Sequence, residues 1–484
     1  MTFHSTLARA TLALLLGGSV AACVTTGTPA PQTGGGTAKA ADAAKGPVVD
    51  IYADAYPSTY RPLPSRTTLI RGANVLTGSG AEIDGANVLI ENGRITAVGK
   101  DIAAPDGAKL IDGAGKWVTP GIIDVHSHLG VYASPNIQAT SDGNEITSPN
   151  TAEVWAEHSI RPQDPGFTRA MAGGVTTMQI LPGSANLFGG RGVTIKNVPS
   201  RTMQGMKFPG APQGLKMACG ENPKRVYGQR RRSPSTAMGN VGYRNAWARA
   251  VEYKRGWDAY YAKVKKGEKA KPPKRNLQMD TLAGVLAGKI RIHNHCYRGD
   301  EMAVMIDVAK EFGYKVTAFH HAVEAYKVAD ILAKNGICAA MWADWWGFKI
   351  EAYDGIKENI AMVDRPKGSC AIVHSDSAIG IQRLNQEAGK AMAAGNARGL
   401  HISRAHAIQW VTLNPAKALG IDRETGSLEA GKAADVVIWD RDPFSVYAKA
   451  EVVMVDGARV WDRNDPSRRP VVDFEVGQPF EGKE

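Results

Sequence analysis

The sequence contains no apolar segment long enough to cross a bilayer as a mature helix. Its N-terminal apolar run, residues 10–16, falls short of the roughly 20 residues that a membrane-spanning helix needs. Cysteine is also scarce, with five in 484 residues, which argues against a fold built on disulfides. Four of them lie in or beside apolar strand-like runs, so we expect them to be buried as small hydrophobic residues. These are Cys219, Cys296, Cys338 and Cys370.

Nucleic-acid-binding motifs are missing as well, although the net charge of the chain is +11. The basic residues are spread along the sequence, apart from a cluster between Arg230 and Arg275. A positive charge attracts an anionic partner when it is gathered on one surface. We therefore expect a mostly solvated charge and no nucleic-acid partner. The sequence is compatible with a monomer or an oligomer.

The first 22 residues have the pattern of a secretory signal peptide. Arg9 precedes the apolar run, and small residues lead to Cys23. This end resembles a bacterial lipobox, in which Cys23 would carry a lipid and become the mature N-terminus; the alternative is an ordinary signal with an incidental cysteine. Residues 23–67 follow as a tether and lead-in, poor in large side chains at first. We expect an exported protein, periplasmic or anchored to the outer membrane of a bacterium.

Residues 118–423 alternate apolar runs with helical stretches, which indicates an α/β fold with a parallel sheet. Eight βα units predict a closed (β/α)8 TIM barrel with its active site at the carboxyl ends of the strands. An insertion at 228–279 has aromatic residues at helical spacing, which predicts a lid or a helix of the outer ring. The eight strands are expected near residues 122–128, 175–181, 193–198, 215–219, 289–295, 314–321, 338–342 and 370–376.

The segments on both sides of the barrel have a different pattern. Residues 68–117 and 424–484 contain short alternating runs separated by glycine-rich turns. Neither segment makes a convincing sheet alone. We therefore expect the two to pair into one small β-sandwich outside the barrel.

Histidine is concentrated at the ends of the predicted barrel strands, which face one cavity in a closed barrel. His126 and His128 stand two residues apart on one strand, so both imidazoles lie on one face and can bind one metal ion. Asp376 follows the eighth strand, where a carboxylate can ligate a metal and accept a proton from water beside it. Seven of the eleven histidines lie at such ends: His126, His128, His293, His295, His320, His321 and His374.

Two further histidine pairs extend this pattern. His293 and His295 are again two residues apart and can share one face of a strand. His320 and His321 are neighbours and point to opposite faces, so we expect only one of them to face the cavity.

These motifs resemble the amidohydrolase superfamily of metal-dependent hydrolases, and within it the imidazolonepropionase-like branch. The resemblance covers about residues 68–463 and implies a (β/α)8 barrel with a small β-sandwich. It also implies hydrolysis of an amide or cyclic amide C–N bond in a small molecule or short peptide. The cofactor would be one or two divalent metal ions, and the imidazole-rich ligand set favours zinc. The matching stretches are residues 119–128, 172–177, 321–327, 374–376, 414–420 and 426–435.

The resemblance also assigns roles to individual residues. It implies that His126 and His128 bind the more buried metal, and that His295 and His321 bind the second metal. Asp376 would ligate the first metal and act as general base. Binuclear relatives carry a bridging anion on the fourth strand, which leaves Glu221 or a carbamylated Lys216. The place of Glu221 at the predicted strand end favours it; with no bridge, the site would hold one metal.

Three other functions remain open from the sequence. A dipeptidase or carboxypeptidase needs a cation for the terminal carboxylate of its substrate, and the candidates are Arg191, Lys196, Arg230 and Arg298. A heterocycle deaminase would use one metal without a bridging anion. A non-catalytic scaffold would keep the fold without the reaction, but it has no physical reason to retain the whole set of predicted ligands.

Overall fold

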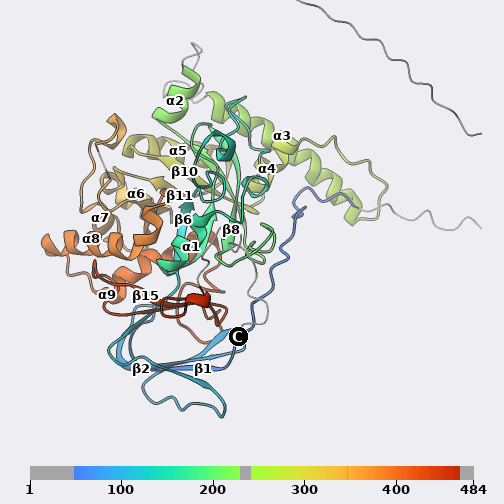
Figure 1. The fold of residues 1–484 in the computed structure, drawn as a ribbon. Coiled ribbons are helices and arrows are strands. Elements are labelled where there is room, and N and C mark those ends of the chain that lie inside the picture. The colour runs from blue at the N-terminus through green and yellow to red at the C-terminus, as the bar shows by residue number, and fades with distance from the viewer. Residues whose placement is uncertain (1–47, 229–240, 346, 469–484) are drawn as a thin grey trace, which may run out of the picture. The chain divides into compact units, whose positions relative to one another are not determined.

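The computed structural model describes residues 48–228, 241–345 and 347–468. The predicted signal peptide and Cys23 lie outside these ranges. All described residues from Val49 onward belong to one compact unit. Within the described ranges, hydrogen bonding sorts the named strands into two eight-stranded sheets, one in the central domain and one built from both chain ends (Figure 1).

The central sheet follows the order of the sequence from β6 to β13 without a break. Its strands are almost fully buried, as expected for strands covered on both faces, and each overlaps a predicted strand. The two edges meet where the backbone N–H of Asp376 donates to the carbonyl of His126 at 3.0 Å, so the barrel is nearly closed. The strands are β6 (Ile122–Ser127), β7 (Val175–Ile180), β8 (Phe188–Lys196), β9 (Gln213–Ala218), β10 (Ile290–Cys296), β11 (Val316–His321), β12 (Cys338–Met341) and β13 (Ala371–Val373).

The prediction of eight parallel βα units is wrong at β8. This strand runs antiparallel to both β7 and β9. Its connections, residues 181–187 and 197–212, contain no helix. A parallel neighbour usually requires a crossover that contains a helix, whereas connections without a helix return the chain antiparallel. The central domain is therefore a mixed α/β barrel.

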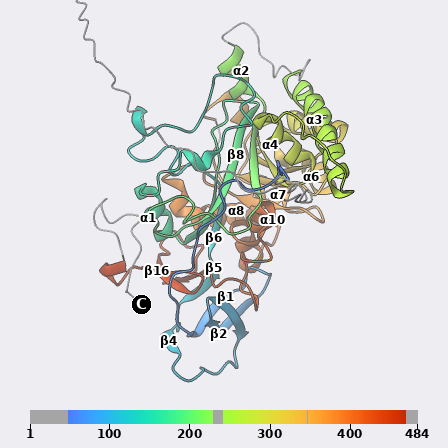
Figure 2. The same cartoon turned by 90° about the vertical axis from the view of Figure 1, so that its right-hand side faces the viewer.

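Helices surround the barrel sheet on its outer side (Figures 1 and 2). The α-helices are α1 (Pro165–Ala172), α2 (Glu221–Gly228), α3 (Val241–Lys265), α4 (Leu277–Leu286), α5 (Gly299–Phe312), α6 (Ala329–Lys334), α7 (Asn359–Val363), α8 (Leu384–Ala397), α9 (Arg404–Ala407) and α10 (Leu413–Leu419). Short 3₁₀ helices are η1 (Gln138–Thr140), η2 (Ala156–His158), η3 (Ala325–Val328), η4 (Ile350–Ala352), η5 (Gly380–Arg383), η6 (Ile408–Val411) and η7 (Pro466–Arg468).

The predicted insertion contributes α3 to the outer ring. Its aromatic residues Tyr243, Trp247 and Trp257 are buried, and the helix packs against α4 and α5. The indole of Trp247 stacks on the ring of Tyr314, which lies before β11, with 4.2 Å between the centroids. The described part of this segment, from Val241 onward, thus corresponds to the outer-ring alternative, whereas residues 229–240 lie outside the described residues.

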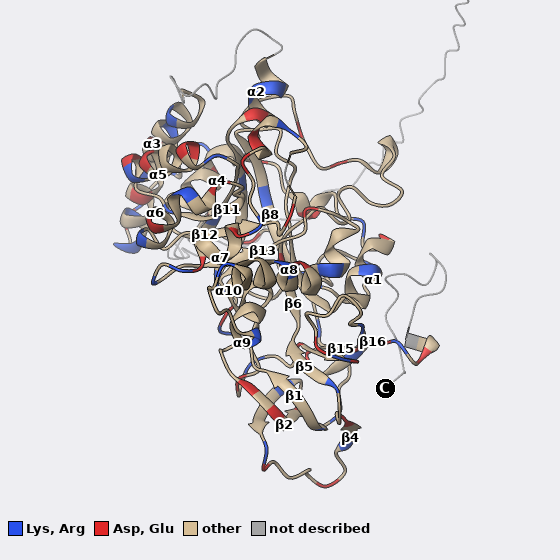
Figure 3. Cartoon of the chain, turned by 90° about the vertical axis from the view of Figure 1, so that its left-hand side faces the viewer, with Lys and Arg blue, Asp and Glu red and all other residues tan. Residues whose placement is uncertain are grey.

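Positions of basic and acidic residues are interspersed along the outer helices, including α3, α5 and α6 (Figure 3). Such a distribution fits the expectation of a solvated surface charge. Among the described helices, none combines the length and the apolar character that crossing a membrane requires.

Both chain ends join in the second sheet, which has the order β16-β15-β14-β5-β1-β2-β3 with β4 beside β1. β14 pairs antiparallel with β5, so the predicted pairing of the two ends is confirmed, while a two-layer sandwich stays a prediction. Because β5 leads directly into β6, this sheet adjoins the N-terminal end of the first barrel strand. The strands are β1 (Thr68–Leu76), β2 (Glu82–Glu91), β3 (Arg94–Gly99), β4 (Lys109–Asp112), β5 (Trp117–Pro120), β14 (Val436–Trp439), β15 (Ala450–Val455) and β16 (Ala458–Asp462).

A buried lysine connects β8 to this terminal sheet. The ammonium of Lys196 lies 2.8 Å from Asp456 Oδ1 and 3.5 Å from Asp435 Oδ1, and its side chain is 4% exposed. The hydroxyl of Tyr60 donates to the other oxygen of Asp456 at 2.6 Å. Lys196 is therefore engaged in the fold, which removes it from the candidates for binding a substrate carboxylate.

Replacing Lys196 by Met should lower the free energy of unfolding by about 3–5 kcal/mol, because it leaves two largely buried carboxylates without their cation. The control is Lys390→Met, which removes ion pairs to Asp344 and Glu387 from a side chain that is 43% exposed. That change should cost less than about 1 kcal/mol. Urea unfolding of both variants measures the difference; equal losses would contradict the structural role of Lys196.

Candidate metal centre

Four of the predicted metal ligands come together at the carboxyl ends of the barrel strands. Nε2 of His126 lies 3.3 Å from Nε2 of His128 and 3.0 Å from Nζ of Lys216. Oδ1 of Asp376 lies 3.1 Å from Nε2 of His128 and 3.4 Å from Nε2 of His126. Two imidazole nitrogens and a carboxylate oxygen thus surround one point, which is a ligand set that suits a divalent metal ion.

A second group of ring nitrogens adjoins this point. His126, His321 and His374 also bring ligand atoms within 4.8 Å of one another. Nδ1 of His321 lies 3.9 Å from Oδ2 of Asp376, and the ring of His295 lies 4.5 Å from that of His321 between centroids. His374, which the sequence placed at a strand end without a metal role, belongs to the same cluster.

Several buried nitrogens of this cluster have no hydrogen-bond partner among the described residues. They are both ring nitrogens of His295 and Nδ1 of His321 and of His374, and each residue is at most 2% exposed. Buried polar atoms nearly always have a partner, so nitrogens that lack one and converge fit a bound cation. Burial lowers the pKa of His295, His321 and His374 below the ordinary value, which keeps the rings neutral and their lone pairs available.

The two bridge candidates lie in different places. Lys216 is on β9, 1% exposed, and contacts His126. Burial lowers the pKa of its ammonium to about 7. Glu221 begins α2 instead, and its backbone N–H donates to Glu351 Oε1 at 2.8 Å. The left-handed Gly220, at φ 76°, turns the chain between them.

The prediction that only one of His320 and His321 faces the cavity is wrong. His320 lies beside His295 in the register of β11 and β10, so strand alternation directs both to the same side. His321 ends the strand at φ 69°, a left-handed conformation that is uncommon for a residue other than glycine. This backbone turn breaks the period of two and brings the next imidazole to the cluster as well. Asp376 has a similar φ of 51°.

The Asp376 carboxylate is the charged group that opens toward solvent, with 25% of its side chain exposed. Burial alone would raise its pKa, but the hydrogen bond with His128 and the electrostatic influence of the neighbouring His128, His374 and Lys216 side chains lower the pKa below the ordinary value. The group is therefore an ionised carboxylate at neutral pH, able to ligate a metal and to accept a proton.

A carboxylate that the sequence analysis missed holds the barrel seam. Asp124 in β6 is fully buried and accepts hydrogen bonds from the backbone N–H groups of His126 at 3.1 Å and Ser375 at 3.2 Å. The hydroxyl of Ser375 donates to its second oxygen. Asp124 thereby positions His126 against the end of β13. The sequence feature that could have revealed this role is the position of Asp124, two residues before His126 on the same strand, where both side chains lie on one face.

The expectation that the four cysteines do not form disulfides is also wrong. Cys219 forms a disulfide with Cys296, and Cys338 forms one with Cys370. The first joins the carboxyl ends of neighbouring β9 and β10, just beyond Lys216; the second joins the opposite ends of β12 and β13. Each pairing depends on which strands are neighbours, a relation that the pattern of a single strand does not reveal.

Removing the disulfide near the cluster should weaken metal binding. Replacing Cys219 and Cys296 by Ser should lower the affinity for zinc about tenfold, because the ends of β9 and β10 lose their link. The matched control replaces Cys338 and Cys370 by Ser. Each double variant should lose about 2–5 kcal/mol of its free energy of unfolding, but the control should keep its affinity for zinc. Competition with a chromophoric chelator measures both. Equal zinc affinities in the two double variants would contradict this role.

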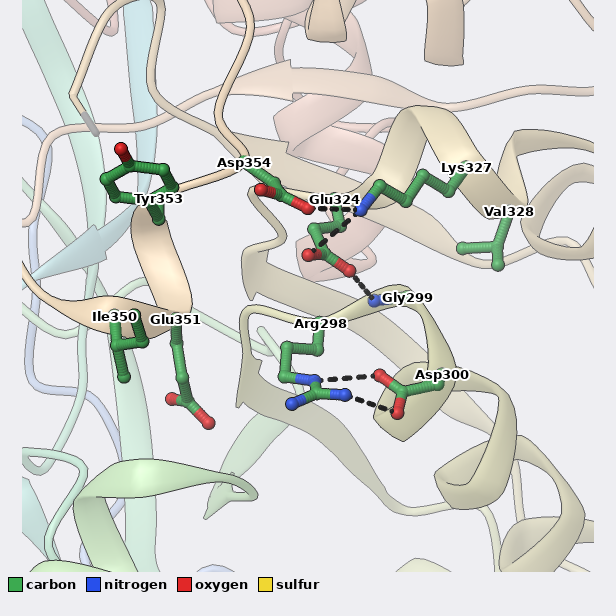
Figure 4. Close-up of a pocket in the computed structure, with 10 residues that line it drawn as sticks. All are labelled: Arg298, Gly299, Asp300, Glu324, Lys327, Val328, Ile350, Glu351, Tyr353 and Asp354. Atoms are coloured by element: carbon green, nitrogen blue, oxygen red, sulfur yellow. Dashed lines mark hydrogen bonds and ion pairs between the residues drawn. The ribbon is translucent and has the colours of Figure 1, made fainter. Parts of the chain in front are cut away.

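A cavity of about 510 Å³ is lined in part by residues that follow the carboxyl ends of β10 and β11 (Figure 4). Both basic side chains that line it are already paired with carboxylates. Arg298 donates to both oxygens of Asp300, at 3.0 and 2.8 Å, and the ammonium of Lys327 lies 2.7 Å from Asp354 Oδ2. Arg191 is likewise engaged, at 2.8 Å from both Thr281 and Gln213, and Arg230 lies outside the described residues.

Two aromatic residues that the sequence analysis did not single out also border the cluster. The ring of Tyr297 stacks on that of His321 with 5.2 Å between centroids. The indole of Trp342 lies 4.5 Å from the ring of His321 and donates to the carbonyl of Ser375 at 3.2 Å. They close one side of the cluster with apolar surface.

Comparisons with known proteins point in one direction. The sequence profile of the Amidohydrolase family matches residues 292–460. The crystal structure of an amidohydrolase from Thermotoga maritima MSB8 is similar, with 35% identity, a TM-score of 0.74, and coverage of 82% of this chain and 100% of that chain. Imidazolonepropionase of Mesorhizobium japonicum is 24% identical over 418 residues, which are 80% of this chain and 94% of the relative. Amidohydrolase tasK of Hapsidospora irregularis is 32% identical over 82% of this chain, and this chain spans 43% of its length.

Proposed function

Because this chain belongs to the amidohydrolase family, we propose that it is a metal-dependent hydrolase that cleaves an amide or cyclic amide C–N bond with an activated water molecule. The observation that carries the proposal is the cluster of His126, His128 and Asp376, whose ligand atoms converge at the mouth of the barrel. The unpartnered buried nitrogens beside it support the same conclusion.

The residues would hold two metal ions. His126, His128 and Asp376 would bind the more buried ion, and His295 and His321 the second. His374 contacts both groups, with its Nε2 accepting a hydrogen bond from the backbone of His321 at 3.2 Å. A shell of neutral imidazoles favours zinc, and the same ligands can also bind manganese, cobalt or iron.

When bound, the metal lowers the pKa of a water molecule and polarises the carbonyl group of the substrate. Asp376 accepts the proton of the attacking water and delivers it to the leaving nitrogen as the C–N bond breaks. Nε2 of His128 lies 3.1 Å from this carboxylate, whose lowered pKa keeps it ionised at neutral pH. His126 is held by the backbone contacts of Asp124, so that its Nε2 stays directed at the cluster.

Lys216 is the bridge that the geometry favours, in place of Glu221. With a pKa near 7, the amine of Lys216 is partly neutral at physiological pH. A neutral amine adds to carbon dioxide, forming an N–C bond and releasing a proton, and the resulting carbamate is an anion with two ligand oxygens. An anion at this position offsets the repulsion between two dications. Glu221 has no described contact with the histidines.

The substrate is proposed to be a small molecule or a short peptide. A carboxypeptidase or dipeptidase requires a cation for the terminal carboxylate, yet the described candidates Arg191, Lys196 and Arg298 are all bound to other groups. A deaminase with one metal requires no bridging anion. Lys216, which could supply such an anion as a carbamate, lies inside the cluster and therefore favours a site with two metals. Neither alternative gains a specific observation in its favour.

The location of the protein is proposed to be outside the cytoplasm, with a lipid on Cys23 that anchors it to a bacterial membrane. Two disulfides in one domain support this proposal, because such bonds persist in oxidising compartments. Mass spectrometry of the N-terminal peptide from the native host tests it. An unmodified N-terminal methionine followed by the leader sequence would overturn both export and lipidation.

The activity itself is tested by removing and restoring the metal. The purified protein is dialysed against dipicolinate, and hydrolysis is assayed on a panel of amides, cyclic amides and dipeptides before and after addition of zinc. We expect hydrolysis of at least one class, its loss in the metal-free protein and its return with zinc. Full hydrolysis by the metal-free protein, or none by the reloaded protein, would refute the proposal.

A further inference from the structure

Three buried histidines form a hydrogen-bonded chain that leads away from the metal cluster. Nδ1 of His126 lies 3.0 Å from Nδ1 of His320, and Nε2 of His320 lies 2.9 Å from Nδ1 of His293. All three side chains are fully buried. The other ring nitrogen of His126, Nε2, faces His128 and Lys216. His126 therefore uses one nitrogen for the cluster and the other for this chain.

We propose that His320 and His293 are positioning residues that fix the ring and the proton of His126 and thereby set the affinity of the centre for its metal. The inference rests on the proposed function in one respect, which is that Nε2 of His126 ligates a metal. Neither His320 nor His293 belongs to the proposed ligand set, and no described contact explains two buried imidazoles here otherwise.

The positions of the protons follow from the two hydrogen bonds together with the proposed role of His126 Nε2 as a metal ligand. A ligand nitrogen cannot carry a proton, so His126 carries its proton on Nδ1 and donates it to Nδ1 of His320. His320 then has its own proton on Nε2 and donates it to Nδ1 of His293. The last proton resides on Nε2 of His293, which has no hydrogen-bond partner among the described residues. One arrangement thus satisfies both bonds and leaves the cluster-facing nitrogen of His126 free.

The row of three histidines gives His126 a hydrogen-bond partner on Nδ1, the ring nitrogen that points away from the metal cluster. An imidazole that donates its second N–H group is held in one orientation, and its ligating nitrogen becomes more basic. Without His320, the ring loses both effects, and its proton is free to occupy Nε2, where it blocks a metal. His320 is itself held by strand register, since it lies beside His295 in the sheet.

Two substitutions of His320 separate hydrogen bonding from packing. Asn places an amide oxygen close to the position of Nδ1, so His320→Asn can still accept the proton of His126. Leu fills a similar volume but accepts nothing. We expect His320→Leu to weaken zinc binding about 10–100-fold and His320→Asn to stay within about threefold of the unsubstituted protein. His293→Leu acts one bond further away, and we expect a smaller loss.

Zinc dissociation constants of the full chain, measured by competition with a chromophoric chelator, decide the matter. Thermal unfolding of the metal-free proteins reports whether each variant is folded; if His320→Leu is not, His320→Ala replaces it with the same expected loss. Equal zinc affinity in the Asn variant, the apolar variant and the unsubstituted protein would overturn the chain's role while leaving the metal centre intact. Failure of the unsubstituted protein to bind zinc, manganese or cobalt would overturn the proposed function together with this inference.

Discussion

Replacing Asp376 by Asn should lower kcat by about a thousandfold on any substrate that the protein hydrolyses. Asn keeps an oxygen that can ligate a metal, but it cannot accept a proton from water at neutral pH. The carboxylate is also the group that contacts His128 at 3.1 Å and opens to solvent, so no other described carboxylate is placed to take over its role. Steady-state kinetics measures the loss, and the metal content of the variant shows whether binding or proton transfer was affected.

The control for this change is Asp364→Asn. Asp364 also contacts a histidine, His406, but it lies outside the metal cluster. Its replacement should leave kcat within about twofold, which separates loss of a catalytic carboxylate from loss of an ordinary ion pair. If Asp376→Asn kept most of its kcat with a full metal content, Asp376 would not be the general base.

Replacing Lys216 by Ala should reduce the metal content from two equivalents to one and lower hydrolysis at least about a hundredfold. Lys216 contacts His126 at 3.0 Å from inside the barrel, where burial lowers its pKa to about 7. Removing it takes away the anion that two neighbouring dications need between them. Metal analysis after extensive dialysis gives the stoichiometry, and added bicarbonate should raise the metal content of the unsubstituted protein alone.

Glu221→Gln is the matched comparison, because it removes the other bridge candidate. Glu221 starts α2 and contacts Glu351, outside the cluster, so its replacement should leave both metal ions in place. Loss of one metal in Glu221→Gln but not in Lys216→Ala would reverse the assignment. A single equivalent in the unsubstituted protein, insensitive to either change, would favour a mononuclear centre.

Much of the fold and of the ligand set could be predicted from the sequence, because both depend on local patterns. Buried strands appear as continuous apolar runs, and a histidine at the end of such a run already lies near the barrel mouth. His126, His128 and Asp376 lie close together for that reason. The roles of the individual ligands, in contrast, came from the resemblance to the amidohydrolase superfamily.

The errors arose where the outcome depended on long-range or backbone geometry. The direction of β8 followed from links that contain no helix, and an apolar run carries no information about direction. The left-handed turn at His321 broke the alternation on which the argument about His320 rested. The disulfides required knowledge of which strands are neighbours.

The central claim is that His126, His128, Asp376, His295 and His321 hold divalent metal at the mouth of the barrel. Anomalous diffraction from crystals of the zinc-loaded protein, measured on both sides of the zinc absorption edge, tests it most directly. The account predicts one anomalous peak in contact with His126, His128 and Asp376, and a second in contact with His295 and His321. It also predicts that the electron density of the Lys216 side chain extends to both peaks. Peaks only at other residues, or none in a fully zinc-loaded protein, would contradict the account.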